Sequence, residues 1–278
     1  MLASLLIVFR EVLEAGLIVG VVLAATEHVH GRALWVSGGV VAGVAGAGLV
    51  ALFAQTLSDA FSGSGQDVFN ACILLAAVLM LSWHTIWMAR HAREMTQDLK
   101  ALGRAVVSGE RTLFAMAVVV AVAVLREGSE VVLFLYGIAS SGGTQPLSML
   151  IGGLGGVGAG GLAAWLLYRG LLAIPAGRLF SVTNGLIALL AAGMAGQAAV
   201  YLTKADLAPT LGDELWDTSS LLPDDGLVGR ALHALVGYSD RPMGLQVLAY
   251  LIVLAALVVL SRVIGGKPGA TRARVAQV

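Results

Sequence analysis

The chain has 278 residues, of which 58% are hydrophobic and only 12% are charged. A soluble domain carries roughly twice that share of charge, so the composition favours an integral membrane protein. Basic and acidic residues balance at 17 each, which excludes the basic surface of a nucleic-acid-binding protein.

The first apolar stretch begins at Leu2, with no basic residues before it and no convincing cleavage site after it. It is therefore not typical of a removable signal, and we expect it to stay in the protein as a helix. Cys72 is the only cysteine, which excludes an internal disulfide and a thiolate cluster for zinc or copper(I).

Runs of about 20 mostly apolar residues predict membrane-spanning helices. In chain order they cover residues 2–25, 34–57, 68–88, 113–138, 148–168, 179–203 and 243–264. The polar connections between them are short, except for 89–112 and 204–242. The sequence thus predicts an all-α, polytopic membrane protein with about seven transmembrane helices.

The distribution of Lys and Arg predicts the orientation of these helices. The odd-numbered connections and the tail together carry twelve Lys and Arg, whereas the second and fourth connections contain none and the long sixth connection contains three. Because cytoplasmic loops retain positive charge, we expect the N-terminus outside and the C-terminus inside.

The first three helices resemble the next three. Three matches carry this internal repeat: the Arg-Glu-x-x-Glu motif at 10–14 with 126–130, the glycine-rich 38–48 with 152–161, and 70–75 with 184–189. Three spans separate each helix from its counterpart, so the copies cross the membrane in opposite directions. Such a 3+3 inverted repeat is typical of transporters that bind substrate near the midplane, and the seventh helix is an addition to it.

The repeat divides the chain into segments. We expect one transmembrane domain over 1–265 and a basic cytoplasmic tail over 266–278. Within the domain lie a first three-helix repeat (1–111), a second three-helix repeat (112–204), an acidic outer loop (205–242) and the seventh helix (243–265).

Six charged residues fall inside predicted spans: Arg10, Glu11, Glu14, Arg126, Glu127 and Glu130. At about 100° per residue, each triplet projects from one face of its helix. A charge at the centre of a membrane helix costs at least a few kcal/mol, which argues for a function. Four acids against two bases leave two excess negative charges, which a multivalent cation would neutralise.

Carboxylate oxygens prefer hard or borderline cations such as iron, manganese, magnesium and calcium, and iron(III) suits them best. Two other interpretations of the motifs stay open at this point. The ion pairs could only fix the register of the helices, or the buried carboxylates could carry protons.

The two motifs, on the first and fourth of seven helices, resemble the oxidase-dependent iron permease family, which includes bacterial EfeU-type and fungal high-affinity iron permeases. The similarity covers nearly the whole chain up to Gly265. It extends to four further stretches: Trp83-x-x-x-Trp87-Met88, Ala191-Ala192-Gly193, Asp217-x-Ser219 and Gly237-Tyr238.

The resemblance implies that Glu11, Glu14, Glu127 and Glu130 handle iron and that Arg10 and Arg126 hold or balance them. It also implies an iron-oxidising or iron-delivering partner in the periplasm or the membrane. The chain departs from the family pattern at Val12 and Ser129 inside the motifs, and at Asn70, where a family glutamate is expected.

We assign a secondary path to polar residues outside the motifs: Asn70, Asn184, Gln197, His28, His30 and Asp217. The loop 204–241 carries four net negative charges and could concentrate cations. Its apolar stretch 227–236 predicts a short interfacial or re-entrant helix. A stripe of Met80, His84, Met88 and His91 in the third helix favours packing over a metal path.

The sequence therefore predicts a multi-pass permease of the inner, cytoplasmic membrane that imports iron through a glutamate-lined site on the first and fourth helices. Iron is its substrate, we expect no permanently bound cofactor, and a homo-oligomer is compatible with the sequence. The alternatives are a proton-coupled transporter of another divalent metal, a membrane enzyme, or a structural or sensor subunit. An enzyme is disfavoured because the chain has no His-Glu-x-x-His zinc motif and no nucleophile with a paired base.

Overall fold

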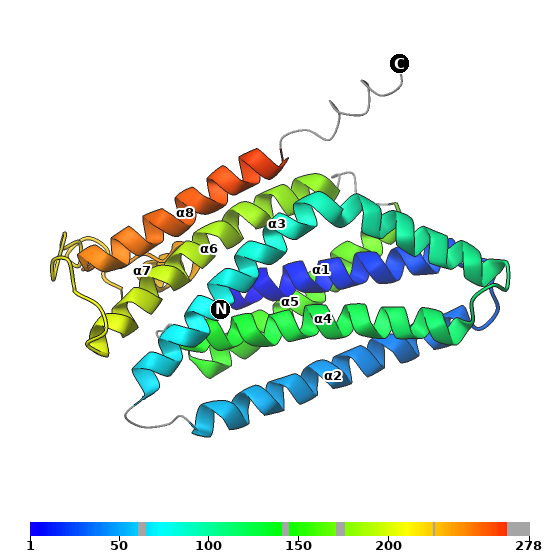
Figure 1. Cartoon of the computed structure of the whole chain (residues 1–278), viewed down its shortest axis with the longest axis horizontal. Coiled ribbons are helices and arrows are strands. Elements are labelled where there is room, and N and C mark those ends of the chain that lie inside the picture. The colour runs from blue at the N-terminus through cyan, green and yellow to red at the C-terminus, as the bar shows by residue number, and fades with distance from the viewer. Residues whose placement is uncertain (61–64, 141–144, 171–175, 225, 266–278) are drawn as a thin grey trace, which may run out of the picture.

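The computed structural model describes residues 1–60, 65–140, 145–170, 176–224 and 226–265. Every regular element within these ranges is a helix (Figure 1). The helices are α1 (Leu2–Ala25), α2 (Arg32–Ala60), α3 (Gln66–Val107), α4 (Leu113–Ser140), α5 (Pro146–Tyr168), α6 (Ala176–Lys204), α7 (Leu227–Val236) and α8 (Gly244–Gly265). The all-α prediction is confirmed. The expected basic tail, 266–278, lies outside the described residues.

Among the described helices, five contain a stretch long and apolar enough to cross a membrane. These stretches are Arg32–Ala54, Gln66–His84, Pro146–Tyr168, Val182–Lys204 and Gly244–Val263. The other two expected spans, in α1 and α4, each carry one Arg and two Glu of the repeated motif. The polytopic membrane fold is thus confirmed, while seven spans and their orientation stay a prediction.

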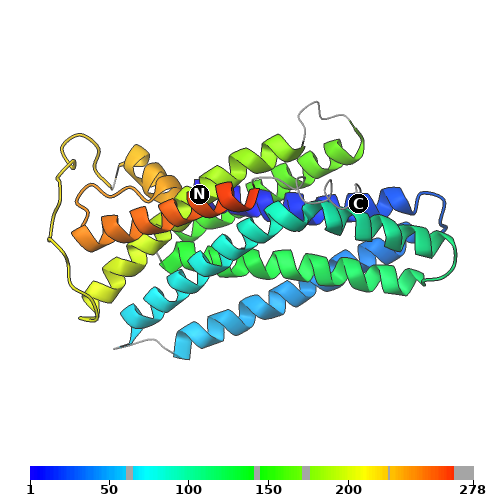
Figure 2. The same cartoon turned by 45° about the horizontal axis from the view of Figure 1, so that its top comes forward.

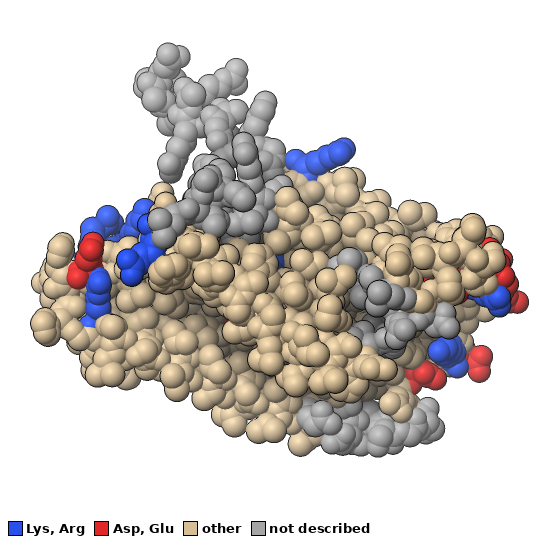
Figure 3. All heavy atoms as spheres, turned by 180° about the vertical axis from the view of Figure 1, so that it is seen from behind, with Lys and Arg blue, Asp and Glu red and all other residues tan. Residues whose placement is uncertain are grey.

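Most charged side chains visible on one face of the molecule lie toward the two ends of its long axis (Figure 3). The band between these ends is almost entirely uncharged on that face (Figure 3). A bilayer core excludes exposed charge, so this distribution suits helices that cross a membrane along the long axis.

The expected polar connection over 89–112 is wrong for most of its length, because α3 continues as a helix to Val107. In the second half of α3, apolar side chains recur at helical spacing, at Met95, Leu99, Leu102 and Val106. They join a buried cluster with the second half of α1 and the first half of α4. Because charged residues lie between these apolar ones, the segment contains no continuous apolar run, and an amphipathic helix of this kind does not resemble a membrane span.

The two repeats pack against each other in exchanged pairs, since α1 lies along α5 and α2 lies along α4. In Figure 1 α1 runs from left to right and α4 from right to left. The helices that carry the two motifs therefore point in opposite directions, as an inverted repeat requires.

Glycines allow these close approaches, and the two repeats use them in the same way. A Cβ added at Gly156 of α5 would lie 2.7 Å from the Leu5 carbonyl oxygen of α1. One added at Gly43 of α2 would lie 2.7 Å from the Ala121 carbonyl oxygen of α4. Both carbonyls precede the arginine of their motif by five residues. The packing thus repeats residue by residue, which is what small residues at a membrane helix interface permit.

Two buried apolar clusters flank the charged motifs. One contains Ile7 of α1 and Phe134 of α4 with residues of α3 and α6. The other contains Ile18 of α1 and Met116 of α4 with the second half of α3. On both α1 and α4 the motif lies between these two clusters.

The loop between α6 and α8 contains α7, which matches the helix predicted over 227–236 (Figure 2). Its C-terminal residue is followed by Gly237 at φ 70°, a left-handed conformation that favours glycine. A Cβ at Gly237 would meet the backbone of Gly193 in α6, and a Cβ at Gly193 would meet Gly237. Two stretches that carry the family resemblance therefore meet where α7 rests on α6.

Candidate metal site between the two charged motifs

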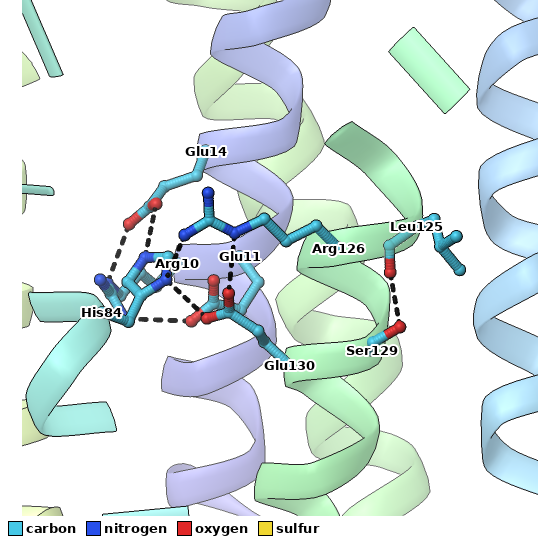
Figure 4. Close-up of polar contacts among 8 residues, drawn as sticks. All are labelled: Arg10, Glu11, Glu14, His84, Leu125, Arg126, Ser129 and Glu130. Atoms are coloured by element: carbon cyan, nitrogen blue, oxygen red, sulfur yellow. Dashed lines mark hydrogen bonds and ion pairs between the residues drawn. The ribbon is translucent and has the colours of Figure 1, made fainter. Parts of the chain in front are cut away.

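Arg10, Glu11 and Glu14 project together from α1 toward α3 and α4 (Figure 4). Arg10 Nη1 donates to Glu11 Oε1 at 3.1 Å, and Arg10 Nε lies 3.0 Å from Glu14 Oε1. The side chains of all three residues are at most 2% exposed. One guanidinium group thus neutralises part of the charge of two buried carboxylates.

The second motif makes a similar but more open arrangement on α4. Arg126 Nε donates to Glu130 Oε1 at 3.2 Å, and the guanidinium carbon lies 4.7 Å from the ring centroid of Trp87. The Arg126 side chain is 41% exposed, whereas that of Glu130 is 4% exposed. Two residues that correspond in the repeat, Arg10 and Arg126, therefore differ in environment.

His84 of α3 lies between the two motifs (Figure 4). Its Nε2 donates to Glu14 Oε2 at 3.0 Å, and its Nδ1 lies 2.7 Å from Glu130 Oε2. The sequence favoured a packing role for His84 because it belongs to a helical stripe with Met80. A polar residue inside an otherwise apolar span was the available signal. The side chains of Met88 and His91, in the same stripe, lie outside the described residues.

The ligand atoms of four buried residues, Glu11, His84, Glu127 and Glu130, lie within 4.8 Å of one another. The Glu127 and Glu11 side chains are hydrogen-bonded to each other. One oxygen of each, Glu11 Oε2 and Glu127 Oε2, is buried without a hydrogen-bond partner. Two facing carboxylates require a proton or a cation between them, and buried oxygens without partners are costly. The arrangement can therefore hold a cation.

The sequence predicted that all four glutamates and both arginines could meet, and the structure does bring them together. Ser129, a departure from the family pattern, donates to the Leu125 carbonyl oxygen of its own helix at 2.7 Å (Figure 4). This hydrogen bond stays within α4 and leaves the motif's carboxylates unaffected.

The sequence profile of the iron permease FTR1 family matches residues 1–267. The chain belongs to the iron permease FTR1 family. The family is one of permeases, so the chain is a transporter of iron and not an enzyme. The family resemblance given by the two motifs is thereby confirmed.

Relatives of the chain in this family are similar along nearly their whole length. The ferrous iron permease EfeU of Escherichia coli O6:H1 (strain CFT073) is 29% identical over 281 residues, 99% of each chain. That of Yersinia pestis is 29% identical over 265 residues, covering 94% of this chain and 93% of the relative. That of Shigella sonnei is 28% identical over 281 residues, again 99% of each chain. No solved structure matches the chain.

The amide residues of the expected secondary path lie on α3 and α6. Asn70, in the first turns of α3, is hydrogen-bonded to Tyr201 near the end of α6. Asn184, partly buried in α6, has an oxygen without a hydrogen-bond partner. Gln197 is partly buried one turn before Tyr201. Asn70 precedes His84 by 14 residues, which is about 21 Å along a helix, so it is not part of the cluster.

The remaining residues of that path lie outside the helices. His28 and His30 are exposed just after α1. Asp217 is exposed in the loop before α7, where its carboxylate accepts from the Ser219 hydroxyl at 2.6 Å and lies 3.2 Å from Arg241 Nη2. The Ser219 hydrogen bonds and the Arg241 charge hold the pKa of Asp217 below its ordinary value. None of the three belongs to the four-residue group of ligand atoms.

Proposed function

We propose that the chain imports iron(II) across the cytoplasmic membrane, and that the ion passes through the cluster formed by Glu11, Glu14, Glu127 and Glu130. One observation carries this proposal. Buried carboxylates from both repeats converge between two apolar clusters, and oxygens without a hydrogen-bond partner are among them, including Glu11 Oε2 and Glu127 Oε2. The relatives are named ferrous iron permeases, which supports iron(II) as the transported species.

The charge of the cluster explains why a divalent ion would bind. Four carboxylates face two guanidinium groups, and burial makes the excess negative charge unfavourable by several kcal/mol per uncompensated ion. A divalent cation cancels that excess and satisfies the free oxygens of Glu11 and Glu127. Arg10 and Arg126 remain paired with carboxylates of the cluster, which reduces the negative charge that the ion meets. The ion is therefore bound weakly enough to be released.

The direction of transport follows from the orientation predicted by the basic loops. The loop 205–242 then lies on the outer side, where its acids attract cations and an iron-delivering partner can dock. The ion would enter from that side, reach the glutamates, and leave toward the cytoplasmic ends of α1 and α4.

The experiment is uptake of radioactive iron(II) into proteoliposomes that contain the purified full-length protein. Glu127→Gln and Glu130→Gln should each reduce uptake at least tenfold, since each removes a charged oxygen donor from the cluster. Glu110→Gln is the matched control, because Glu110 is an exposed acid between α3 and α4. Unchanged uptake by correctly folded Glu127→Gln and Glu130→Gln protein would contradict the proposed path.

A further inference from the structure

The two motifs correspond residue by residue in the sequence, yet their second glutamates are used differently. Glu130 belongs to the group of ligand atoms that lie within 4.8 Å of one another, whereas its counterpart Glu14 does not. His84 belongs to that group instead. The site is therefore built from three carboxylates and one imidazole, and the inverted repeat alone does not account for it.

Both oxygens of Glu14 are already engaged. Oε1 lies 3.0 Å from Arg10 Nε, and Oε2 accepts from His84 Nε2 at 3.0 Å. The second contact has the geometry of the carboxylate–histidine pairs that orient metal-bound imidazoles, in which the ring nitrogen opposite the metal donates to a carboxylate. This leaves Nδ1 as the nitrogen of His84 that faces the cluster.

We propose that His84 binds the transported iron through Nδ1, and that Glu14 is a positioning residue that orients the imidazole rather than a ligand. The inference rests on the proposed iron site. The ligands are then His84 Nδ1 with carboxylate oxygens of Glu11, Glu127 and Glu130.

Distances around Nδ1 suit this assignment. Divalent first-row ions lie about 2.1 Å from nitrogen and oxygen ligands, so two adjacent ligands of an octahedral site are about 3.0 Å apart. His84 Nδ1 and Glu130 Oε2 are 2.7 Å apart. Arg126 Nη2 also approaches Nδ1, at 3.4 Å, and its partly exposed side chain has room to move away.

The second repeat does not provide an equivalent nitrogen. His84 follows Asn70 by 14 residues, and Ala198 follows Asn184 by the same number. Ala198 is fully buried in an apolar cluster. Imidazole favours iron over the hard ions magnesium, calcium and manganese, which prefer oxygen-only sites. His84 would thus make a carboxylate site selective for iron(II).

The test is electron spin echo envelope modulation of Mn(II) bound to the purified full-length protein in detergent. Mn(II) is the probe because it is paramagnetic and its echo reports nitrogen nuclei bonded to the metal. We expect nitrogen modulation from a coordinated imidazole, and we expect that modulation to change when the protein is labelled with ¹⁵N-histidine. Iron(II) should displace the Mn(II).

Variants then assign the signal to a residue. His84→Gln should abolish the nitrogen modulation and lower the preference for iron(II) over Mn(II) in uptake by about tenfold or more. Glu14→Gln keeps an oxygen that accepts from Nε2, so it should keep the modulation and lose about tenfold in affinity, whereas Glu14→Ala should weaken the modulation. His233→Gln is the control, since His233 lies on α7, where its Nδ1 donates to the Tyr238 carbonyl oxygen, and it does not belong to the group of ligand atoms.

Two results would overturn different parts of the argument. Mn(II) that binds in a Glu130-dependent way but shows no histidine nitrogen would refute ligation by His84 and leave the acidic site standing. Mn(II) binding that Glu130→Gln does not change would refute the proposed iron site itself. The ¹⁵N-labelling arm needs no substitution, so it remains decisive if His84→Gln fails to fold.

Discussion

The unequal burial of the two motif arginines predicts unequal costs of removing them. Arg10 is 1% exposed and contacts two carboxylates, whereas Arg126 is 41% exposed and contacts one. We compare Arg10→Gln with Arg126→Gln, the same substitution at two positions that correspond in the repeat. Each serves as the matched control for the other.

Arg10→Gln leaves two buried carboxylates without their cation, a change that typically costs about 3–5 kcal/mol. Arg126→Gln removes one ion pair of a partly exposed side chain and one contact with Trp87, which together are worth about 1–2 kcal/mol. We therefore expect Arg10→Gln to be the more destabilising by about 2 kcal/mol or more.

Thermal unfolding of the purified variants in detergent measures this difference. A gap of about 2 kcal/mol corresponds to roughly 5 °C in Tm for a chain of this size. Adding Glu14→Gln to Arg10→Gln should recover part of the loss, because it removes one of the uncompensated charges. Equal Tm values for Arg10→Gln and Arg126→Gln would show that burial does not set the cost, and the reasoning would fail.

Three further outcomes can be measured in the same way. Gly156→Ala should lower stability by about 1–3 kcal/mol through its clash with a carbonyl oxygen, while Gly153→Ala, which has no neighbouring atom within 4 Å, should be neutral or slightly stabilising. Tyr238→Phe removes a hydroxyl that makes two hydrogen bonds in the loop before α8 and should cost about 1–2 kcal/mol, seen as faster amide exchange there. Burial and the neighbouring Asp240 carboxylate raise the pKa of Asp224, so its contribution favours the folded loop at low pH and is lost as the pH rises through that raised pKa. Asp224→Asn should therefore gain Tm relative to the wild type at pH 7 and lose the advantage below pH 3.8, the ordinary pKa of an aspartate; an advantage that does not change with pH would contradict this.

The sequence was sufficient for the helices whose apolar faces are continuous. The first span, 2–25, has the bounds of α1, and the short helix predicted over 227–236 is α7. The sequence was insufficient for the second half of α3, because its apolar residues alternate with charged ones. Their role as a packing face is clear only from their contacts with α1 and α4. Long amphipathic extensions of membrane helices are easily mistaken for loops for this reason.

The convergence of the two charged motifs could be predicted because it follows from two local facts. Helical periodicity places Arg10, Glu11 and Glu14 on one face, and the repeat places the same pattern on an antiparallel helix. Which oxygens remain free could not be predicted, because that depends on how far each arginine reaches. Arg10 is enclosed and pairs twice, while Arg126 leans toward Trp87.

His84 could not be placed from helical periodicity because its neighbours belong to other helices. Leu81, one turn earlier, is buried in a cluster with residues of α1, α4 and α6, so this face of α3 packs against the helices that carry the motifs. The repeat nevertheless contains a signal. At positions related by the inverted symmetry, the intramembrane histidine of one copy corresponds to an alanine, Ala198, in the other. A symmetric scaffold needs no such difference for its packing, so a polar residue without a polar counterpart marks where chemistry has been added to the scaffold.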